Sequence, residues 1–187
     1  MLIGYAFCGS FCTFSRSISV MEQLRAAGHE ILPIMSEIAY STDTRFGRAE
    51  DIRKRITDIC DREITHTVDG AEPLGPKVKL DVLIVSPCTG NTLSKLAHGV
   101  TDTSVTMACK AHLRSDRPLI ISLASNDAMS ANLANLSRLL MRKSVYFVPL
   151  LQDDPDKKPH SLVAEFERIP ETLAAAMEGR QIRPLFV

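Results

Sequence analysis

The sequence predicts an α/β fold in which an open, mostly parallel sheet has helices on both faces. Short apolar runs of strand length alternate several times with segments whose apolar residues recur at helical spacing. The run at 81–86 (DVLIVS) is apolar at successive positions, as expected for a central parallel strand buried on both faces. Such folds bind ligands at the carboxyl ends of their strands, so the loops that follow the strands are the candidate site.

Each element is predicted from its pattern in turn. Strand-length apolar runs occupy 2–7, 31–35, 81–86, 118–123 and 146–148. Helical spacing is found over 14–24, 52–59, 91–98, 103–112, 129–140 and 161–178. Gly28 stands where the first helix would end, and the last helix is expected to break or restart at Pro170. Pro87 is expected to stop the third strand.

The composition is that of an ordinary globular chain. Its 187 residues favour one domain, residues 1–187, in which a loop and a helix follow from about residue 150. Apolar residues make up 45% of the chain, which is enough to form a core. Lys+Arg and Asp+Glu number 22 each, so no basic footprint predicts a nucleic-acid partner. Apolar runs are too short to span a membrane, and no membrane partner is expected.

Cysteine usage favours a reducing, cytoplasmic location. Five scattered cysteines, an odd number, do not form the pattern of a disulfide framework. Cys8 and Cys12 are four residues apart, but no second Cys/His pair has the spacing of a metal site, so no metal is expected. The first fourteen residues lack both the positive flank and the cleavage site of a signal peptide.

The loop after the first strand has the character of an anion site. Gly9, Ser10 and Phe11 stand between strand and helix, where backbone amides can approach a phosphate at the helix N-terminus. Ser36 directly follows the second strand and could supply a hydroxyl to the same phosphate. The alternatives are an ordinary tight turn and an ordinary loop serine. Because the loop matches neither G-x-G-x-x-G nor a Walker loop, a dinucleotide or triphosphate receives no support.

The loop after the third strand, SPCTGNTLSK, is the most specific pattern in the chain. It concentrates hydrogen-bonding side chains at a helix N-terminus, where they could cap the helix or hold a flat heteroaromatic ring. Lys95, one turn into the helix, would add a charge near the same mouth, while Cys88 is expected to be a small packing residue. The polar or loop-shaping residues of this string are Ser86, Pro87, Thr89, Asn91, Thr92 and Lys95.

The string SPCTGNTLSKLAHGVTD resembles the signature P-x-T-x-N-T-x-x-K-x-A-x-G-x-x-D of the flavoprotein family that includes cysteine-peptide decarboxylases and flavin prenyltransferases. The resemblance covers about residues 2–150 and implies an FMN site. In that reading Gly9, Ser10 and Ser36 hold the phosphate, while Thr89, Asn91 and Asn126 face the ring and the substrate. The full implied set is Gly9, Ser10, Phe11, Ser36, Ser86, Pro87, Thr89, Asn91, Thr92, Lys95, Ser125 and Asn126.

Residues 125–166 resemble a narrower family, the flavoprotein-like B subunits of dipicolinate synthases. The resemblance implies oxidation of a dihydrodipicolinate-type precursor to pyridine-2,6-dicarboxylate, in the mother cell of a spore-forming bacterium. It also implies a partner A subunit that carries NAD(P). A dicarboxylate needs cations, so Lys157 and Lys158 are candidates beside Asn126 and Asp127. The alternative for the two lysines is a solvated loop of mixed charge.

Departures from the decarboxylase pattern argue against cysteine decarboxylation. The catalytic histidine of those enzymes has no counterpart, because His66 lies too far upstream and Pro73 stands nearer its place. Asn126 and Asp127 stand where those enzymes carry a Pro-Ala-Met-Asn string. Gly90 replaces a frequent alanine, a change that the loop is expected to tolerate. His29, His98 and His112 are expected to be caps or surface groups, and no catalytic base is identified.

The prediction is therefore a flavin-type oxidoreductase subunit, which need not be active alone. Two alternatives stay open: a non-catalytic partner with a degenerate flavin site, and an FMN-dependent decarboxylase or prenyltransferase of the same fold. The family resemblance also implies a homo-oligomer, a trimer or a multiple of trimers.

Overall fold

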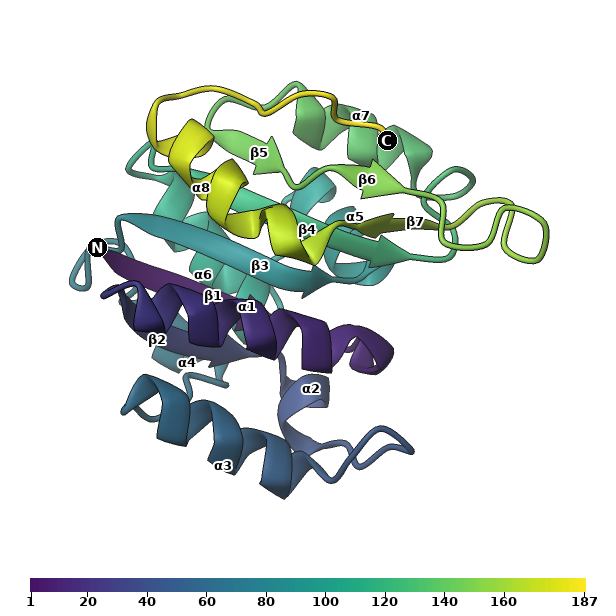
Figure 1. Cartoon of the computed structure of the whole chain (residues 1–187). Helices are drawn as coiled ribbons and strands as arrows, with labels where there is room; N and C mark the ends of the chain where they lie inside the picture. Colours follow the sequence, from purple (N-terminus) through teal and green to yellow (C-terminus); the bar gives the residue numbers. More distant parts are fainter.

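A seven-stranded sheet forms the centre of the protein, whose computed structural model describes all 187 residues (Figure 1). The strands are β1 (Leu2–Phe7), β2 (Glu30–Met35), β3 (Val82–Cys88), β4 (Leu119–Ser125), β5 (Val145–Phe147), β6 (Leu150–Leu151) and β7 (Leu162–Ala164). They run in the order β2-β1-β3-β4-β7-β6, and β5 also pairs with β4. The predicted fold class, an α/β protein with a mostly parallel sheet, is confirmed.

The parallel part of the sheet reverses its direction of winding between β1 and β3. β1 pairs in parallel with β2 on one side and with β3 on the other. β3 pairs in parallel with β4, and β4 with β5. The order β2-β1-β3-β4-β5 therefore leaves a crevice at the carboxyl ends of β1 and β3, where doubly wound sheets bind their ligands.

Helices cover both faces of the sheet (Figure 1). α1 and α8 lie across the front face in that view, and α5, α6 and α7 lie behind it. The shorter α4 packs on α6, while α3 lies beside β2 and α2 at the lower edge. The bounds are α1 (Phe14–Ala26), α2 (Glu37–Ser41), α3 (Ala49–Cys60), α4 (Val68–Ala71), α5 (Gly90–His98), α6 (Ser104–Leu113), α7 (Leu133–Leu140) and α8 (Ile169–Met177).

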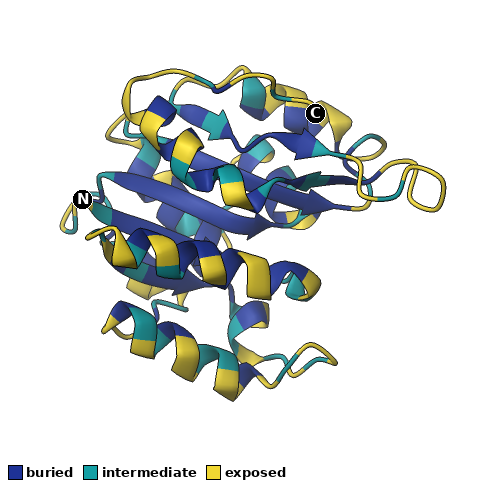
Figure 2. Ribbon diagram, in the orientation of Figure 1, coloured by how far each residue is buried: buried dark blue, intermediate teal, exposed yellow.

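The core forms because the central strands are apolar on both faces. Every residue of β3 and β4 is buried, as is all of β1 after Leu2, and the sheet is dark blue throughout in Figure 2. α1 buries the predicted stripe that begins at Phe14 and ends at Leu24. Gly28 follows the helix with a φ of +87°, the left-handed conformation that glycine adopts without strain, so the predicted end of this helix is confirmed.

The prediction of one helix over 161–178 is wrong in its first half. β7 lies there instead, followed by a short 3-10 helix (Phe166–Arg168), and α8 begins only at Ile169, with Pro170 in its first turn. The cause is long-range pairing: β7 runs antiparallel to the last residues of β4, Ala124 and Ser125. Such pairing overrides local propensity, and no sequence spacing indicates it.

Two other boundaries differ from the prediction. Pro87 does not stop β3, because the strand continues to Cys88 across a register shift after Val85, and the carbonyl of Pro87 accepts a hydrogen bond from the Cys8 amide (3.1 Å). A proline is tolerated in a strand at such an irregularity. α7 begins at Leu133 rather than Met129, because turns centred on the Asp127 carbonyl occupy the intervening residues.

Candidate functional site

A pocket of about 840 Å³ lies where β1, β3 and β4 end. That volume is in the range of small-molecule and cofactor sites. Its walls come from four segments that are far apart in sequence: the loop after β1, the start of α5, the loop after β4 and the segment that leads into β7. The lining residues are Gly9, Ser10, Phe11, Cys12, Thr13, Arg16, Phe46, Thr89, Gly90, Asn91, Ala124, Ser125, Asn126, Asp127, Asp153, Lys158, Ser161 and Val163.

The loop after β1 presents a helical N-terminus to the pocket. A 3-10 helix (Phe11–Thr13) runs directly into α1, so its first backbone N–H groups have no partner within the turn. Thr13 donates its hydroxyl hydrogen bond to the Ser10 carbonyl (2.8 Å), which fixes the turn. Glycine at position 9 keeps the backbone open to an approaching group. The arrangement favours an anion.

The start of α5 forms the opposite wall. Thr89 is the N-cap, and its hydroxyl accepts a hydrogen bond from the Thr92 amide (3.2 Å). Capping therefore falls to Thr89, and the exposed side chain of Asn91 is left facing the pocket. This wall combines free backbone donors at a helix start with a side-chain amide that can both donate and accept.

A chain of polar contacts supports the floor. The hydroxyl of Ser125 donates to Oδ1 of Asp127, and the Asn132 amide donates to Oδ2 of the same carboxylate (2.9 Å). Asn135 then donates to Oδ1 of Asn132 (3.0 Å). Glycine at position 90 is required here, because a Cβ would lie only 2.5–2.7 Å from side-chain atoms of Ser125, Asn132 and Asp127. Gly90 was expected only to be tolerated.

Two cations reach the pocket, each beside an acidic partner. The guanidinium of Arg16 bonds Glu167 through two nitrogens (3.1 and 2.7 Å) and lies 5.0 Å from the centre of the Phe166 ring. The ammonium of Lys158 pairs with Asp153, and this contact raises the pKa of the lysine and lowers that of the aspartate. Both pairs are solvent-accessible, so an anionic ligand can compete for the cations at modest cost.

Several residues that the sequence singled out lie outside the pocket lining. Ser36 caps α2 through a hydrogen bond from the Ala39 amide (3.3 Å). Lys157 is exposed, with its ammonium 4.0 Å from Asp154. Of the predicted set, those outside the lining are Ser36, Ser86, Pro87, Thr92, Lys95 and Lys157, and those that line it are Gly9, Ser10, Phe11, Thr89, Asn91, Ser125, Asn126, Asp127 and Lys158.

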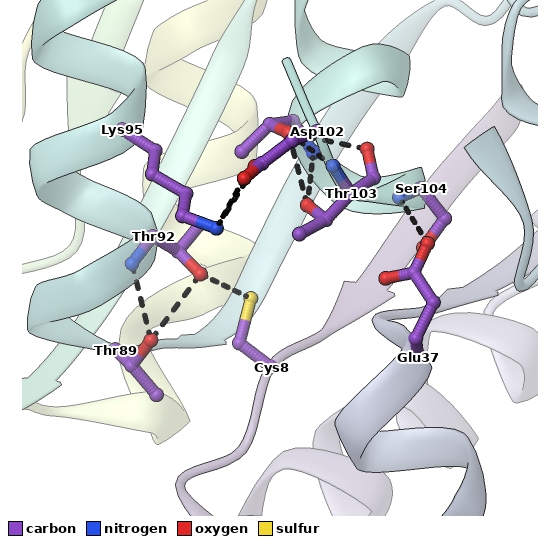
Figure 3. Close-up of polar contacts among 9 residues, drawn as sticks. Cys8, Glu37, Thr89, Thr92, Lys95, Asp102, Thr103 and Ser104 are labelled. Atoms are coloured by element: carbon purple, nitrogen blue, oxygen red, sulfur yellow. Dashed lines mark hydrogen bonds and ion pairs between the residues drawn. The ribbon is translucent and has the colours of Figure 1, made fainter. Parts of the chain in front are cut away.

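Lys95 points away from the pocket, into the turn between α5 and α6 (Figure 3). Its ammonium lies 2.8 and 3.0 Å from the two carboxylate oxygens of Asp102, and this contact holds the pKa of Asp102 below its usual range. The lysine and the aspartate of the sequence signature are thus partners of each other. They fix how α6 follows α5, and the Thr103 capping box then begins α6.

Thr92 and Cys8 join α5 to the end of β1 beneath the pocket. The Thr92 hydroxyl donates to the sulfur of Cys8 (3.2 Å), as Figure 3 shows. Burial raises the pKa of the Cys8 thiol to about 11, so this cysteine is a neutral packing residue. Cys88 is also buried, as expected, and burial raises its pKa as well.

A buried hydroxyl cluster fixes α1 against the sheet. Ser17 donates to the Ser86 carbonyl (2.7 Å), and the hydroxyl of Tyr5 donates to the Ser17 carbonyl (3.0 Å). Burial raises the pKa of Tyr5 to about 12, so the phenol stays protonated. Ser86 therefore acts on the pocket through the position of α1.

No histidine lines the pocket. The expectation that His112 is a cap or a surface group is wrong: its side chain is 1% exposed and its Nε2 lies 2.9 Å from the Pro118 carbonyl. Burial lowers its pKa. His66 stacks on Tyr40 with ring centres 3.7 Å apart, away from the pocket.

The pocket also contains residues that sequence reasoning missed. Arg16 lies one turn beyond the first loop, and that position at a helix start was the only signal available for it. Phe46, Asp153, Ser161 and Val163 come from segments that reach the pocket only through tertiary packing. The remaining missed residues are Cys12, Thr13, Gly90 and Ala124.

Comparisons with known proteins agree with this geometry. The family model described as Flavoprotein matches residues 2–178. The chain is 40% identical to the B subunit of the dipicolinate synthase of Bacillus subtilis (strain 168) over 185 residues, which cover 99% of this chain and 92% of that protein. The crystal structure of the B subunit of dipicolinate synthase from Bacillus halodurans C has a TM-score of 0.92 at 38% identity, covering 100% of this chain and 95% of the other. The resemblances stated from the sequence are confirmed.

A more distant structure shows how widely the fold is shared. The FMN-dependent cysteine decarboxylase SpaF has a TM-score of 0.70 at 22% identity, covering 95% of each chain. No helix of the chain has the length and apolar character needed to cross a membrane.

Proposed function

This chain belongs to the flavoprotein family, and from that premise we propose that it acts as the B subunit of a dipicolinate synthase. It binds FMN in the pocket and oxidises a dihydrodipicolinate-type precursor to pyridine-2,6-dicarboxylate. The observation that carries the proposal is the pocket itself. It lies at the reversal between β1 and β3, and two helix starts face it from opposite sides.

The residues present fit FMN. Gly9, Ser10 and Thr13 surround the first helical N-terminus, where a phosphate group is stabilised by free amides and by the helix dipole. Asn91 and Asn126 present side-chain amides that suit the carbonyl and imide edge of the flavin ring. Flavin, when bound, supplies a two-electron acceptor for a hydride.

The implied residues outside the lining would act through those inside it. Ser86 and Pro87 set the positions of α1 and of the first loop, Thr92 joins α5 to β1, and Lys95 fixes the end of α5. Ser36 follows β2 next to the first loop, since its amide donates to the Phe7 carbonyl (2.9 Å).

The substrate is a dicarboxylate, and the cations on the open side of the pocket match it. Arg16 offers a planar fork that can bind a carboxylate through two hydrogen bonds. Lys158 offers a point charge that must first leave Asp153. Lys157 would contribute only if the loop 152–160 turned inward, because its side chain does not line the pocket.

A partner A subunit that carries NAD(P), a homo-oligomeric state and a location in the cytoplasm of the spore mother cell complete the proposal. They follow from the similarity to B subunits. Light scattering tests the oligomer: a trimer or a multiple of trimers is expected, and a monomer of 20.6 kDa would contradict it.

The function is tested by assaying the chain alone, the A subunit alone and the mixture for formation of pyridine-2,6-dicarboxylate. Flavin-dependent product formation that needs this chain supports the proposal. Equal activity of the A subunit alone would assign this chain an accessory role. Conversion of a cysteinyl peptide would instead support a decarboxylase of the same fold.

A further inference from the structure

Of the two carboxylates that line the pocket, one has no cationic partner. Asp153 is neutralised by Lys158. Asp127, by contrast, has no lysine, arginine or histidine nitrogen within 4.0 Å, and its partners are the neutral groups of Ser125 and Asn132. A carboxylate held only by neutral donors keeps its charge available to a ligand.

The carboxylate of Asp127 is held in one orientation. Each of its oxygens accepts one hydrogen bond, from the Ser125 hydroxyl and from the Asn132 amide. Asn132 is 6% exposed and is itself fixed by Asn135, which is 8% exposed. The backbone carbonyl of Asp127 accepts bonds from the amides of Ser130 and Asn132 (both 3.1 Å). Each carboxylate oxygen still has a lone pair to offer.

Glycine at position 90 makes room for this group. Its own hydrogen faces Oδ1 of Asp127, and a methyl group there would lie 2.7 Å from that oxygen and 2.5 Å from the Ser125 hydroxyl. Neither atom belongs to a long flexible side chain that could give way cheaply. The start of α5 and the loop after β4 are therefore built together around the carboxylate.

We infer that Asp127 is the proton acceptor of the oxidation, an inference that rests on the proposed function. Conversion of a dihydropyridine ring to a pyridine ring removes one hydride and one proton. The hydride leaves with its electron pair to the flavin. The second ring C–H bond breaks, its proton forms an O–H bond on the Asp127 carboxylate, and its electron pair stays in the ring as the last π bond. The carboxylic acid then returns the proton to water.

The test compares Asp127→Asn with Asp156→Asn, an exposed aspartate outside the pocket. Each full-length variant is loaded with FMN, and its dissociation constant is measured by fluorescence titration. It is then mixed anaerobically with the dihydropyridine dicarboxylate while flavin reduction is followed by absorbance. Asp127→Asn should keep FMN affinity within about threefold and slow reduction by about 10²- to 10⁴-fold, the usual contribution of a general base. Asp156→Asn should match the wild type.

The pH profile separates proton transfer from a structural role. The wild-type rate should fall at acid pH, where the carboxylate becomes protonated, and Asp127→Asn should lack this fall. A second variant, Ser125→Ala, keeps the carboxylate but removes one donor to its charged form. Its acid fall should move to higher pH. A structural role alone would leave the profile unchanged.

The outcomes are distinct. If Asp127→Asn reduces flavin at the wild-type rate, or if it loses FMN affinity in proportion to its rate, the inference is overturned while the proposed function stands. If the wild type neither takes up FMN nor reduces it with this substrate, the proposed function fails and the role of Asp127 fails with it.

Discussion

At the scale of single residues, the loops predicted the lining of the pocket better than they predicted its chemistry. Gly9, Ser10, Thr89 and Asn91 could be placed at the pocket from sequence because each closely follows a predicted strand. Arg16 could not, since an arginine on an exposed helix face has no distinguishing pattern.

Replacing Arg16 tests its proposed role as a carboxylate anchor. We expect Arg16→Met to weaken binding of pyridine-2,6-dicarboxylate about tenfold, because one charge-assisted contact is lost. Calorimetric titration of the FMN-loaded protein measures the change. Arg62→Met is the matched control, since Arg62 also pairs with a glutamate at 2.6 Å and its side chain is 43% exposed against 45% for Arg16. Equal affinities for the two variants would contradict the role.

At the scale of elements, α1 owes its position to a polar contact inside an apolar core. Ser17 is 0% exposed and connects α1 to the Ser86 carbonyl and to the phenol of Tyr5. The hydrophobic period predicted α1 and its buried stripe, but a serine in that stripe gave no indication of a partner 69 residues away.

Removing that hydroxyl should weaken the whole fold. We expect Ser17→Ala to lower the free energy of unfolding by about 1–3 kcal/mol, because the buried groups that it contacts lose a hydrogen-bond partner. Urea denaturation measures the loss. Ser19→Ala, on the exposed face of the same helix, should change stability by less than about 0.5 kcal/mol. A similar loss in both variants would show that helix propensity, rather than the buried contact, is responsible.

At the scale of the whole molecule, the sequence predicted the parallel sheet and failed at its far edge. β1 to β5 are apolar runs with clear boundaries, and all five were expected. β6 and β7 are two and three residues long, and they exist because the segment after the loop 152–160 turns back to pair with β4. That turn also brings Asp153, Lys158 and Ser161 to the pocket, so the same missing information hid part of the site.

Buried His112 should make stability depend on pH. Burial lowers its pKa in the folded state below the ordinary value of 6.5, so the unfolded chain takes up the proton first. Stability should be complete above pH 6.5 and fall as pH decreases from there toward the lowered pKa. Melting temperatures between about pH 7.5 and 5.5 measure the slope. His112→Gln should reduce that slope, while His160→Gln, at an exposed position, should leave it unchanged. Equal slopes in all three proteins would contradict this account.

The visible absorbance spectrum of the purified protein, before and after addition of FMN, tests the central claim most directly. Binding at the pocket predicts a perturbed flavin spectrum in the wild type and in Gln23→Ala, a substitution on the exposed face of α1. In Asn91→Ala that spectrum should be lost, or FMN affinity should fall by about tenfold or more, since one polar contact to the ring is removed. A wild-type protein that stays colourless and leaves the spectrum of added FMN unchanged would contradict the claim.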